Sequence, residues 1–211
     1  MGKGRFITFE GPEGVGKTTQ VKRISEAFNR LNIPFIAVRE PGSTKIGDQI
    51  RSLLLDPQFQ MMTIKTEMLL FAAARAQLIE EVIRPALDAG KVVLCDRFVD
   101  SSIAYQAFGA GAKFDDVLQV NQIAIAGCLP DRTYLLDVSV SKSRERLSKR
   151  GQQLDRQEAK EQDFHQRVRD GYLQLAAKQP QRFVKIAADQ SREQVFSMIW
   201  SDLEAQISHL L

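Results

Sequence analysis

The chain has 211 residues, a length that suits one domain of ordinary size. Hydrophobic residues make up 44% and charged residues 26% of it, which is typical of a folded globular chain and excludes collagen, a coiled-coil rod and a disordered tail. The net charge of +3 is too small to indicate nucleic acid, and the uncharged stretches are too short to span a bilayer, so we expect no nucleic-acid or membrane partner.

Short β-rich runs alternate with longer helical patterns along the chain. The runs predict five strands, at Arg5–Glu10, Phe35–Val38, Val92–Cys95, Tyr134–Leu136 and Phe183–Ile186. Helices are expected at about 17–31, from Thr63 to near Gly90, and after Ser191, where a capping box opens the last one. Strands separated by helices imply an α/β fold with a doubly wound parallel sheet and helices on both faces. Because such sheets bind ligands at the carboxyl ends of their strands, functional residues are expected just after each strand.

A glycine-rich segment directly follows the first strand. Residues 11–18, Gly-Pro-Glu-Gly-Val-Gly-Lys-Thr, match the phosphate-loop pattern G-x-x-x-x-G-K-[ST] without a mismatch. Glycines let successive N–H groups turn toward phosphate oxygens, and the following helix adds its positive end. We expect Lys17 to reach the β- and γ-phosphates and the Thr18 hydroxyl to ligate Mg²⁺. The expected ATP site comprises Gly11, Pro12, Glu13, Gly14, Val15, Gly16, Lys17, Thr18 and Thr19. The guanine-reading pattern N-K-x-D does not occur, which favours a small-molecule kinase over a GTPase.

Charged residues also follow the second and third strands. Asp96 at the end of the third strand can hold the magnesium shell through water, and Arg97 can brace an acceptor phosphate. A surface Asp–Arg pair is the alternative for these two residues. Arg39 and Glu40 follow the second strand. Their position at the carboxyl edge of the sheet fits a role in ligand binding, and an ordinary charged loop fits the spacing equally well.

The long expected helix carries Phe71 and Arg75, which lie four residues apart and therefore on one face. This pair suits a flat base, with Phe71 stacking on the ring and Arg75 donating to a carbonyl on its edge. A core phenylalanine beside a snorkelling arginine fits the same pattern. Further on, residues 142–170 hold nine basic and six acidic side chains, which indicates either a small anionic ligand or a solvated helical face.

Together these segments resemble the bacterial thymidylate kinases, which phosphorylate dTMP to dTDP with ATP in dTTP biosynthesis. The resemblance covers nearly the whole chain and rests on six segments in matching order: 9–20, 39–42, 50–55, 70–77, 96–106 and 154–158. It implies a five-stranded P-loop NTPase-type fold, with a single nucleoside monophosphate kinase domain over residues 1–211 and a short lid at about 148–162. It also implies ATP and dTMP as substrates, Mg²⁺ as cofactor, and a homodimer that pairs through its long helices.

The resemblance implies the residues that bind dTMP. Phe71 would stack on thymine, and Arg75 would donate to O4, an acceptor where cytosine carries an amino donor. The remaining assignments are Arg39, Arg51 and Arg97 around the phosphate, Ser102 and Gln106 in the base pocket, and Tyr105 against the deoxyribose. Ser43 departs from the pattern, because many relatives have a glycine there.

Catalytic roles follow from the same resemblance. Glu13 resembles the family's acidic residue near the sugar 3′-hydroxyl and the magnesium shell. The phosphate loop contains no arginine, so the lid residues Arg150 and Arg156 are the candidates to close over the triphosphate. The expected catalytic set is therefore Lys17, Arg97, Arg150, Arg156 and Glu13, with Thr18 and Asp96 as the metal-binding pair.

Two other functions stay open from the sequence. A kinase for another monophosphate, such as dCMP or dUMP, would use the same loops with a different base pocket. A nucleotide-binding regulator that has lost turnover is possible, although such a protein would not need the acceptor-side residues. The two cysteines, Cys95 and Cys128, lie in apolar surroundings outside any metal or redox spacing, which favours reduced thiols in a cytoplasmic protein.

Overall fold

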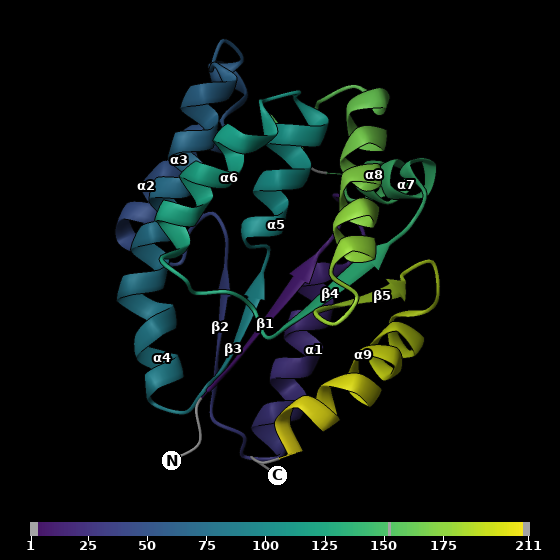
Figure 1. Cartoon of the computed structure of the whole chain (residues 1–211). Helices are drawn as coiled ribbons and strands as arrows, with labels where there is room; N and C mark the ends of the chain where they lie inside the picture. The colour runs from purple at the N-terminus through teal and green to yellow at the C-terminus, as the bar shows by residue number, and fades with distance from the viewer. Residues whose placement is uncertain (1–3, 152, 209–211) are drawn as a thin grey trace.

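The computed structural model describes residues 4–151 and 153–208, so the ends of the expected domain and Gln152 of the expected lid lie outside the described residues. Within the described residues, five parallel strands form one sheet in the order β2-β3-β1-β4-β5 (Figure 1). The strands are β1 (Arg5–Glu10), β2 (Phe35–Arg39), β3 (Val92–Asp96), β4 (Arg132–Asp137) and β5 (Phe183–Ala187). The expected doubly wound parallel sheet is confirmed.

Helices connect the strands throughout. They are α1 (Lys17–Arg30), α2 (Lys45–Leu55), the 3₁₀ turn η1 (Pro57–Phe59), α3 (Ile64–Leu78), the π-helical η2 (Ile79–Ile83), α4 (Arg84–Asp88), α5 (Val99–Ser102), the π-helical η3 (Ile103–Gly109), α6 (Phe114–Ile125), α7 (Val140–Lys149), α8 (Gln162–Lys178) and α9 (Arg192–Ile207). The long helix expected from the sequence is the continuous run α3–η2–α4. Helices α2, α6, α7 and α8 were not among the expected elements.

Local side-chain caps explain where several helices begin. Thr63 caps α3 by accepting a hydrogen bond from the Thr66 backbone. At α9 the expected capping box is present: Ser191 accepts from the Gln194 backbone, and the Gln194 side chain accepts from the Ser191 backbone. These caps satisfy helix N–H groups that have no partner inside the helix.

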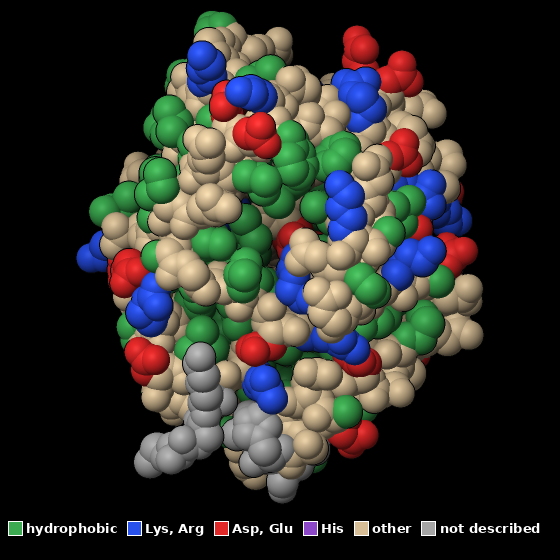
Figure 2. All heavy atoms as spheres, viewed as in Figure 1, with side chains coloured by type: hydrophobic (Ala, Val, Ile, Leu, Met, Phe, Trp, Pro, Cys, Tyr) green, Lys and Arg blue, Asp and Glu red, His purple; other side chains and the backbone are tan. Residues whose placement is uncertain are grey.

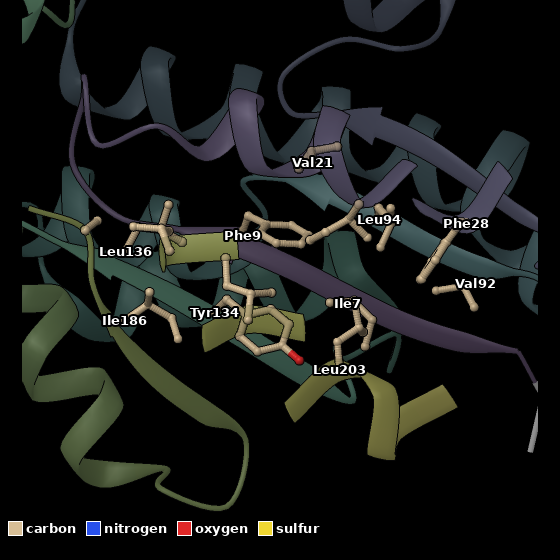
Figure 3. Close-up of a cluster of buried hydrophobic side chains, with 14 of the residues drawn as sticks. Ile7, Phe9, Val21, Phe28, Val92, Leu94, Tyr134, Leu136, Ile186 and Leu203 are labelled. Atoms are coloured by element: carbon tan, nitrogen blue, oxygen red, sulfur yellow. The ribbon is translucent and has the colours of Figure 1, made fainter. Parts of the chain in front are cut away.

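The sheet is buried on both faces. Ile7 and Phe9 of β1 face α1 and α9 in the core drawn in Figure 3, whereas Phe6 faces the helices of the α3–α4 run. This two-sided burial explains why the strands read as nearly continuous apolar runs in the sequence. No helix in the described part of the chain is both long and apolar enough to cross a membrane.

The strand register brings the charged strand ends to one edge of the sheet. Asp96 pairs with Phe9 of β1 on one side and with Arg39 of β2 on the other. The residues that follow β1, β2 and β3 therefore meet at this carboxyl edge, and the phosphate loop starts at its centre. The fold thus places the phosphate loop and the charged residues that end β2 and β3 side by side at the carboxyl edge of the sheet.

Candidate active site

A cleft of about 1090 Å³ lies over the carboxyl edge of the sheet. The phosphate loop, the ends of β2 and β3, the helices α3 and η3, the α7–α8 connection and the β5–α9 turn all contribute to its walls. Of the expected ATP-site residues, those from Glu13 to Thr19 line the cleft. Gly11 and Pro12 do not; both are buried behind the loop.

The phosphate loop depends on glycine at its turns. Gly14 and Gly16 have φ of 68° and 100°, a conformation that other residues adopt only with strain. At Gly11, with φ of 134°, a Cβ would lie 2.3 Å from the carbonyl oxygen of Leu136. The loop runs into the N-terminus of α1 at Lys17, which gives it the geometry of an anion cradle.

Lys17 is buried and turned back onto the loop. Its Nζ donates to the carbonyl oxygens of Gly11 at 2.9 Å and Pro12 at 2.7 Å. Burial and the nearby positive charge of Arg97 lower the pKa of Lys17 to about 8, although neighbouring carboxylates oppose the shift. The ammonium group therefore lies at the loop, held by weak neutral acceptors that anionic phosphate oxygens can replace.

Thr18 and Asp96 form a pair of hard oxygen donors beside the loop. The Thr18 hydroxyl donates to the Asp96 carboxylate at 2.5 Å, and both residues line the cleft. No group of three His, Cys, Asp or Glu side chains that could hold a metal occurs among residues 4–151 and 153–208. Mg²⁺ on a nucleotide needs only one or two protein oxygens in addition to phosphates and waters, so this donor set fits it.

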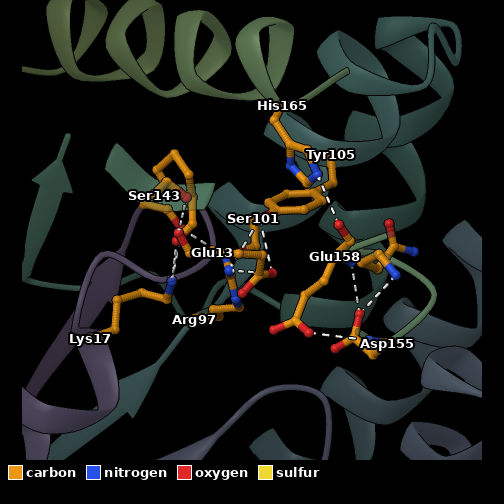
Figure 4. A network of polar contacts seen from close by, with 12 residues as sticks. Glu13, Lys17, Arg97, Ser101, Tyr105, Ser143, Asp155, Glu158 and His165 are labelled. Carbon is orange, nitrogen blue, oxygen red and sulfur yellow. Dashed lines mark hydrogen bonds and ion pairs between the residues drawn. The ribbon is translucent and has the colours of Figure 1, made fainter. Parts of the chain in front are cut away.

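Arg97 is fixed in a dense polar network beside the loop (Figure 4). Its guanidinium forms an ion pair with Glu13 at 2.7 Å and donates to the hydroxyls of Tyr105, Tyr172 and Ser101 at 3.1 Å each. Burial opposes ionisation of Glu13, but Arg97 and Lys17 outweigh it and lower the pKa of Glu13 to about 2. Glu13 is therefore a permanent anion at neutral pH, and Arg97 is held rigidly.

Glu10 lies directly beneath this network and was not expected from the sequence. It is fully buried and accepts hydrogen bonds from the Phe98 backbone, the Ser101 hydroxyl and the Tyr172 hydroxyl. Burial, together with the charge of Asp100, raises the pKa of Glu10 to about 7. A glutamate at the end of a mostly apolar strand, directly before the phosphate loop, was the sequence signal that could have identified it.

Two further arginines stand at the same edge. Arg39 ends β2 and Arg51 lies on α2, and both line the cleft. Arg51 donates to the Pro41 carbonyl at 2.9 Å, and its pKa is lowered by burial and by the charge of Arg39. Like charges held this close raise the local positive potential, which favours an anion such as a phosphate between them.

The base pocket expected from the helix pattern lies at one end of the cleft. Phe71 and Arg75 of α3 line this end together with Ser102, Tyr105 and Gln106. Arg75 does not snorkel, because only 1% of its side chain is exposed. Its Nε and Nη2 bind Glu40 at 2.6 to 3.1 Å, Nη2 also donates to the Phe98 carbonyl, and Nη1 donates to Asn121.

Glu67 connects the expected base pocket to the expected lid. One carboxylate oxygen accepts from the Gln106 amide at 2.8 Å, and the other accepts from Gln157 at 2.8 Å and Arg156 at 2.5 Å. Glu67, on α3, was not predicted from the sequence, because its partners lie 39 to 90 residues away. Gln157, also not predicted, brings the α7–α8 connection to the edge of the pocket.

The two expected lid arginines occupy different environments. Arg150 lines the cleft, is 39% exposed and pairs with Glu158 at 2.7 Å. Arg156 is buried, pairs with Glu67, donates to the Leu54 carbonyl at 2.8 Å and does not line the cleft. The structure therefore does not bring Arg156 to the phosphate loop, and its contacts attach the α7–α8 connection to α2 and α3.

The opposite end of the cleft is formed by α1, α7, the β5–α9 turn and the start of α9. It is lined by Gln20, Arg146, Ala188, Gln190, Ser191, Arg192 and Val195. Arg146 donates to the Ala188 carbonyl at 2.8 Å, which connects α7 to the end of β5. The phosphate loop thus lies between two ends of one cleft.

Comparison with known proteins identifies a family for this arrangement. The thymidylate kinase family model matches residues 9–199. The chain is 48% identical over 200 residues to a thymidylate kinase of Exiguobacterium sibiricum, covering 95% of this chain and 94% of the relative. It is 44% identical to a thymidylate kinase of Clostridium novyi over 94% of this chain and 98% of the relative. The crystal structure of thymidylate kinase from Ehrlichia chaffeensis superposes with a TM-score of 0.77 at 32% identity, covering 96% of this chain and 99% of the other. The chain belongs to the thymidylate kinase family.

Proposed function

We propose that this chain transfers the γ-phosphate of ATP to dTMP and releases dTDP and ADP, a step of dTTP biosynthesis. The observation that carries the proposal is a single cleft in which a phosphate loop adjoins a pocket made by Phe71 and Arg75. Membership of the thymidylate kinase family supports the same reaction. Phosphoryl transfer depends on alignment and charge neutralisation rather than on a protein base, and this cleft is built for both.

The ATP phosphates bind on the part of the loop that lines the cleft, from Glu13 to Thr19. Backbone N–H groups at the start of α1 face the phosphate oxygens, and Lys17 exchanges its two carbonyl partners for the β- and γ-phosphates. Thr18 and, through water, Asp96 would hold Mg²⁺. A bound metal ion would supply charge neutralisation for the phosphates.

The thymine base is read by hydrogen-bonding groups that remain available in the pocket. One hydrogen of Arg75 Nη1 goes to Asn121, and the second is left to donate to thymine O4. The side-chain oxygen of Gln106 has no partner among the described residues, while its nitrogen faces the acceptor-only Glu67. This oxygen accepts from thymine N3–H. Cytosine has an amino group at the O4 position and no N3–H, so it would fail both contacts.

The dTMP phosphate binds among Arg39, Arg51 and Arg97 at the strand ends, with the deoxyribose against Tyr105 and the base beside Ser102. Glu13 lies at the sugar 3′-hydroxyl and the magnesium shell. Its ion pair with Arg97 fixes both groups before substrate arrives, which reduces the reorganisation needed in the transition state.

Residues 148–162 act as the lid, and Arg150 meets the transferring phosphoryl group when the lid closes. Two observations support Arg150 over Arg156: it already lines the cleft, and its guanidinium is held by a single carboxylate, that of Glu158. Arg156 instead serves as the attachment of the lid to α2 and α3.

A second copy of the chain covers the outer face of α2, α3 and α6. These helices lie side by side, and hydrophobic side chains gather over them in Figure 2. The exposed apolar residues there are Ile46, Leu53, Ile64, Leu69 and Ile123, the last of which is 81% exposed. A homodimer would bury this surface, and Ile123→Glu would shift the molar mass measured by light scattering from dimer to monomer.

The cytoplasm is the compartment that fits the cysteines. Cys95 and Cys128 are both buried in one apolar cluster, as is usual for structural cysteines of proteins in a reducing compartment.

The deciding experiment measures ADP release by the purified protein with ATP, Mg²⁺ and each nucleoside monophosphate in turn. Turnover with dTMP far above that with dUMP, dCMP, AMP and GMP supports the proposal. Preference for another base would overturn the base pocket while leaving the phosphate site intact. Binding of ATP without turnover of any monophosphate would identify a regulator instead, and Lys17→Met provides the inactive control.

A further inference from the structure

Unpaired polar atoms in this protein gather in the cleft. Among the described residues, the buried side-chain atoms without a hydrogen-bond partner are Arg5 Nε and the amide oxygens of Gln20, Gln106 and Gln157. All three glutamines line the cleft. Because a buried acceptor without a donor is costly, three such oxygens in one cavity indicate positions where a ligand supplies the donor.

Gln20 differs from the other two in its place. It lies in the first turn of α1, three residues after Lys17, at the end of the cleft opposite Phe71 and Arg75. Only 3% of Gln20 is exposed. Its side-chain nitrogen donates to the Arg192 backbone carbonyl at 3.1 Å. Since a carbonyl can only accept, this bond fixes the orientation of the amide and leaves the oxygen as a bare acceptor.

The donor nucleotide must present its base at this end. The acceptor base occupies the Phe71 end under the proposed function, and the reacting phosphates meet over the loop between the two ends. The walls near Gln20 include the buried apolar side chains of Ala188 and Val195 and the guanidinium of Arg146, surfaces that suit a flat ring.

We propose that Gln20 is a specificity-determining residue for the phosphate donor, with its side-chain oxygen accepting a hydrogen bond from the exocyclic amino group of adenine. Guanine carries a carbonyl oxygen at that ring position, which would face the Gln20 oxygen as a second acceptor. The contact therefore favours ATP over GTP. The inference rests on the proposed function for the location of the base, and it concerns binding alone.

Equilibrium binding tests the contact without requiring turnover. Calorimetry would compare ATP with purine riboside triphosphate, which lacks only the amino group, in Mg²⁺ and without dTMP. We expect the wild-type protein to bind ATP about tenfold more tightly. In Gln20→Leu the two nucleotides should bind within about twofold of each other. Loss of the Gln20 bond to α9 weakens both nucleotides equally, so it cancels in this ratio.

Matched controls separate the contact from general damage. Gln166 is exposed on α8, where its side chain donates a hydrogen bond to Asp170, and Gln166→Leu should keep the wild-type preference for ATP. A wild-type preference below twofold would overturn the proposal even if Gln20→Leu does not fold. A preference that persists unchanged in folded Gln20→Leu would overturn it as well. If ATP binds selectively but dTMP is not phosphorylated, the proposed function fails while this contact stands.

Discussion

Replacing Glu40 by glutamine isolates the ion pair that supports the base pocket. Arg75 and Glu40 are 1% and 4% exposed, and three contacts of 2.6 to 3.1 Å join them. Glu40→Gln keeps the shape of the side chain but removes its charge and turns one acceptor into a donor. The Arg75 guanidinium then stays buried without a counter-charge, which typically costs about 3–5 kcal/mol.

Urea unfolding measures this loss directly, and steady-state kinetics measure its effect on the site. We expect the free energy of unfolding to fall by about 3–5 kcal/mol in Glu40→Gln and the KM for dTMP to rise, with the KM for ATP unchanged. The KM should rise because Arg75 is no longer held at the position from which, under the proposed function, Nη1 donates to the base. A stability within about 1 kcal/mol of wild type would refute the assignment of a buried, mutually dependent pair.

Two further variants sharpen the measurement. Arg75→Met removes the other partner, and the double variant should cost less than the sum of the single changes, because the second change removes a group that is already unpaired. Glu80 pairs with Arg84 in an exposed position, so Glu80→Gln is the matched surface control and should leave the unfolding midpoint unchanged.

Two other predictions concern the lid and the pH dependence. Arg150→Ala should lower kcat by about 10³-fold, whereas Arg156→Ala should leave kcat much less affected. Both variants leave a buried carboxylate without its arginine, Glu158 in the first and Glu67 in the second, so Tm should fall in both and kcat is the readout that separates them. Normal turnover of Arg150→Ala would remove Arg150 from the reaction. Because the pKa of Glu13 is about 2 when folded and 4.5 when unfolded, its contribution to stability is complete above pH 4.5 and is lost as the pH falls toward 2. The difference in unfolding free energy between wild type and Glu13→Gln should therefore shrink by about 2 kcal/mol from pH 6 to pH 3, and an equal difference at both pH values would contradict the shift.

The sequence predicts those parts of the fold whose formation depends on residues close together in the chain. The central strands β1, β3 and β4 are recognisable because burial on both faces makes them mostly apolar, and α9 is recognisable because Ser191 and Gln194 form its cap within one turn. Helix α8 could have been found too. Its buried residues Phe164, Val168, Tyr172 and Leu175 recur at helical spacing, but the surrounding charges hid the pattern.

The site residues also divide into those that are positioned by neighbouring sequence and those that are positioned by distant partners. Lys17 and Thr18 follow from a contiguous motif, since the loop and helix that position them are adjacent in the chain. The ion pair of Arg156 with Glu67 joins residues 89 apart, and no local pattern indicates that this arginine turns inward rather than toward the phosphates. At Ser43, by contrast, a departure from the family's sequence pattern has a local explanation. The residue's φ of 67° explains why a glycine is usual there, and its hydroxyl accepts from the Arg39 backbone at 2.9 Å.

The strand order has a consequence for how this chain matures during synthesis. The phosphate loop extends from β1, which is made first but lies at the centre of the sheet, between β3 and β4. Phe6 pairs with Val93 and Ile7 with Arg132, so a nascent chain exposes both edges of β1 until the ribosome has passed residue 96, and one edge until it has passed residue 137. Pairing across such long separations is slow and leaves apolar edges open to aggregation. Fragments that stop before β4 should therefore accumulate as insoluble material, and the nucleotide cradle can become rigid only after nearly two thirds of the chain has emerged.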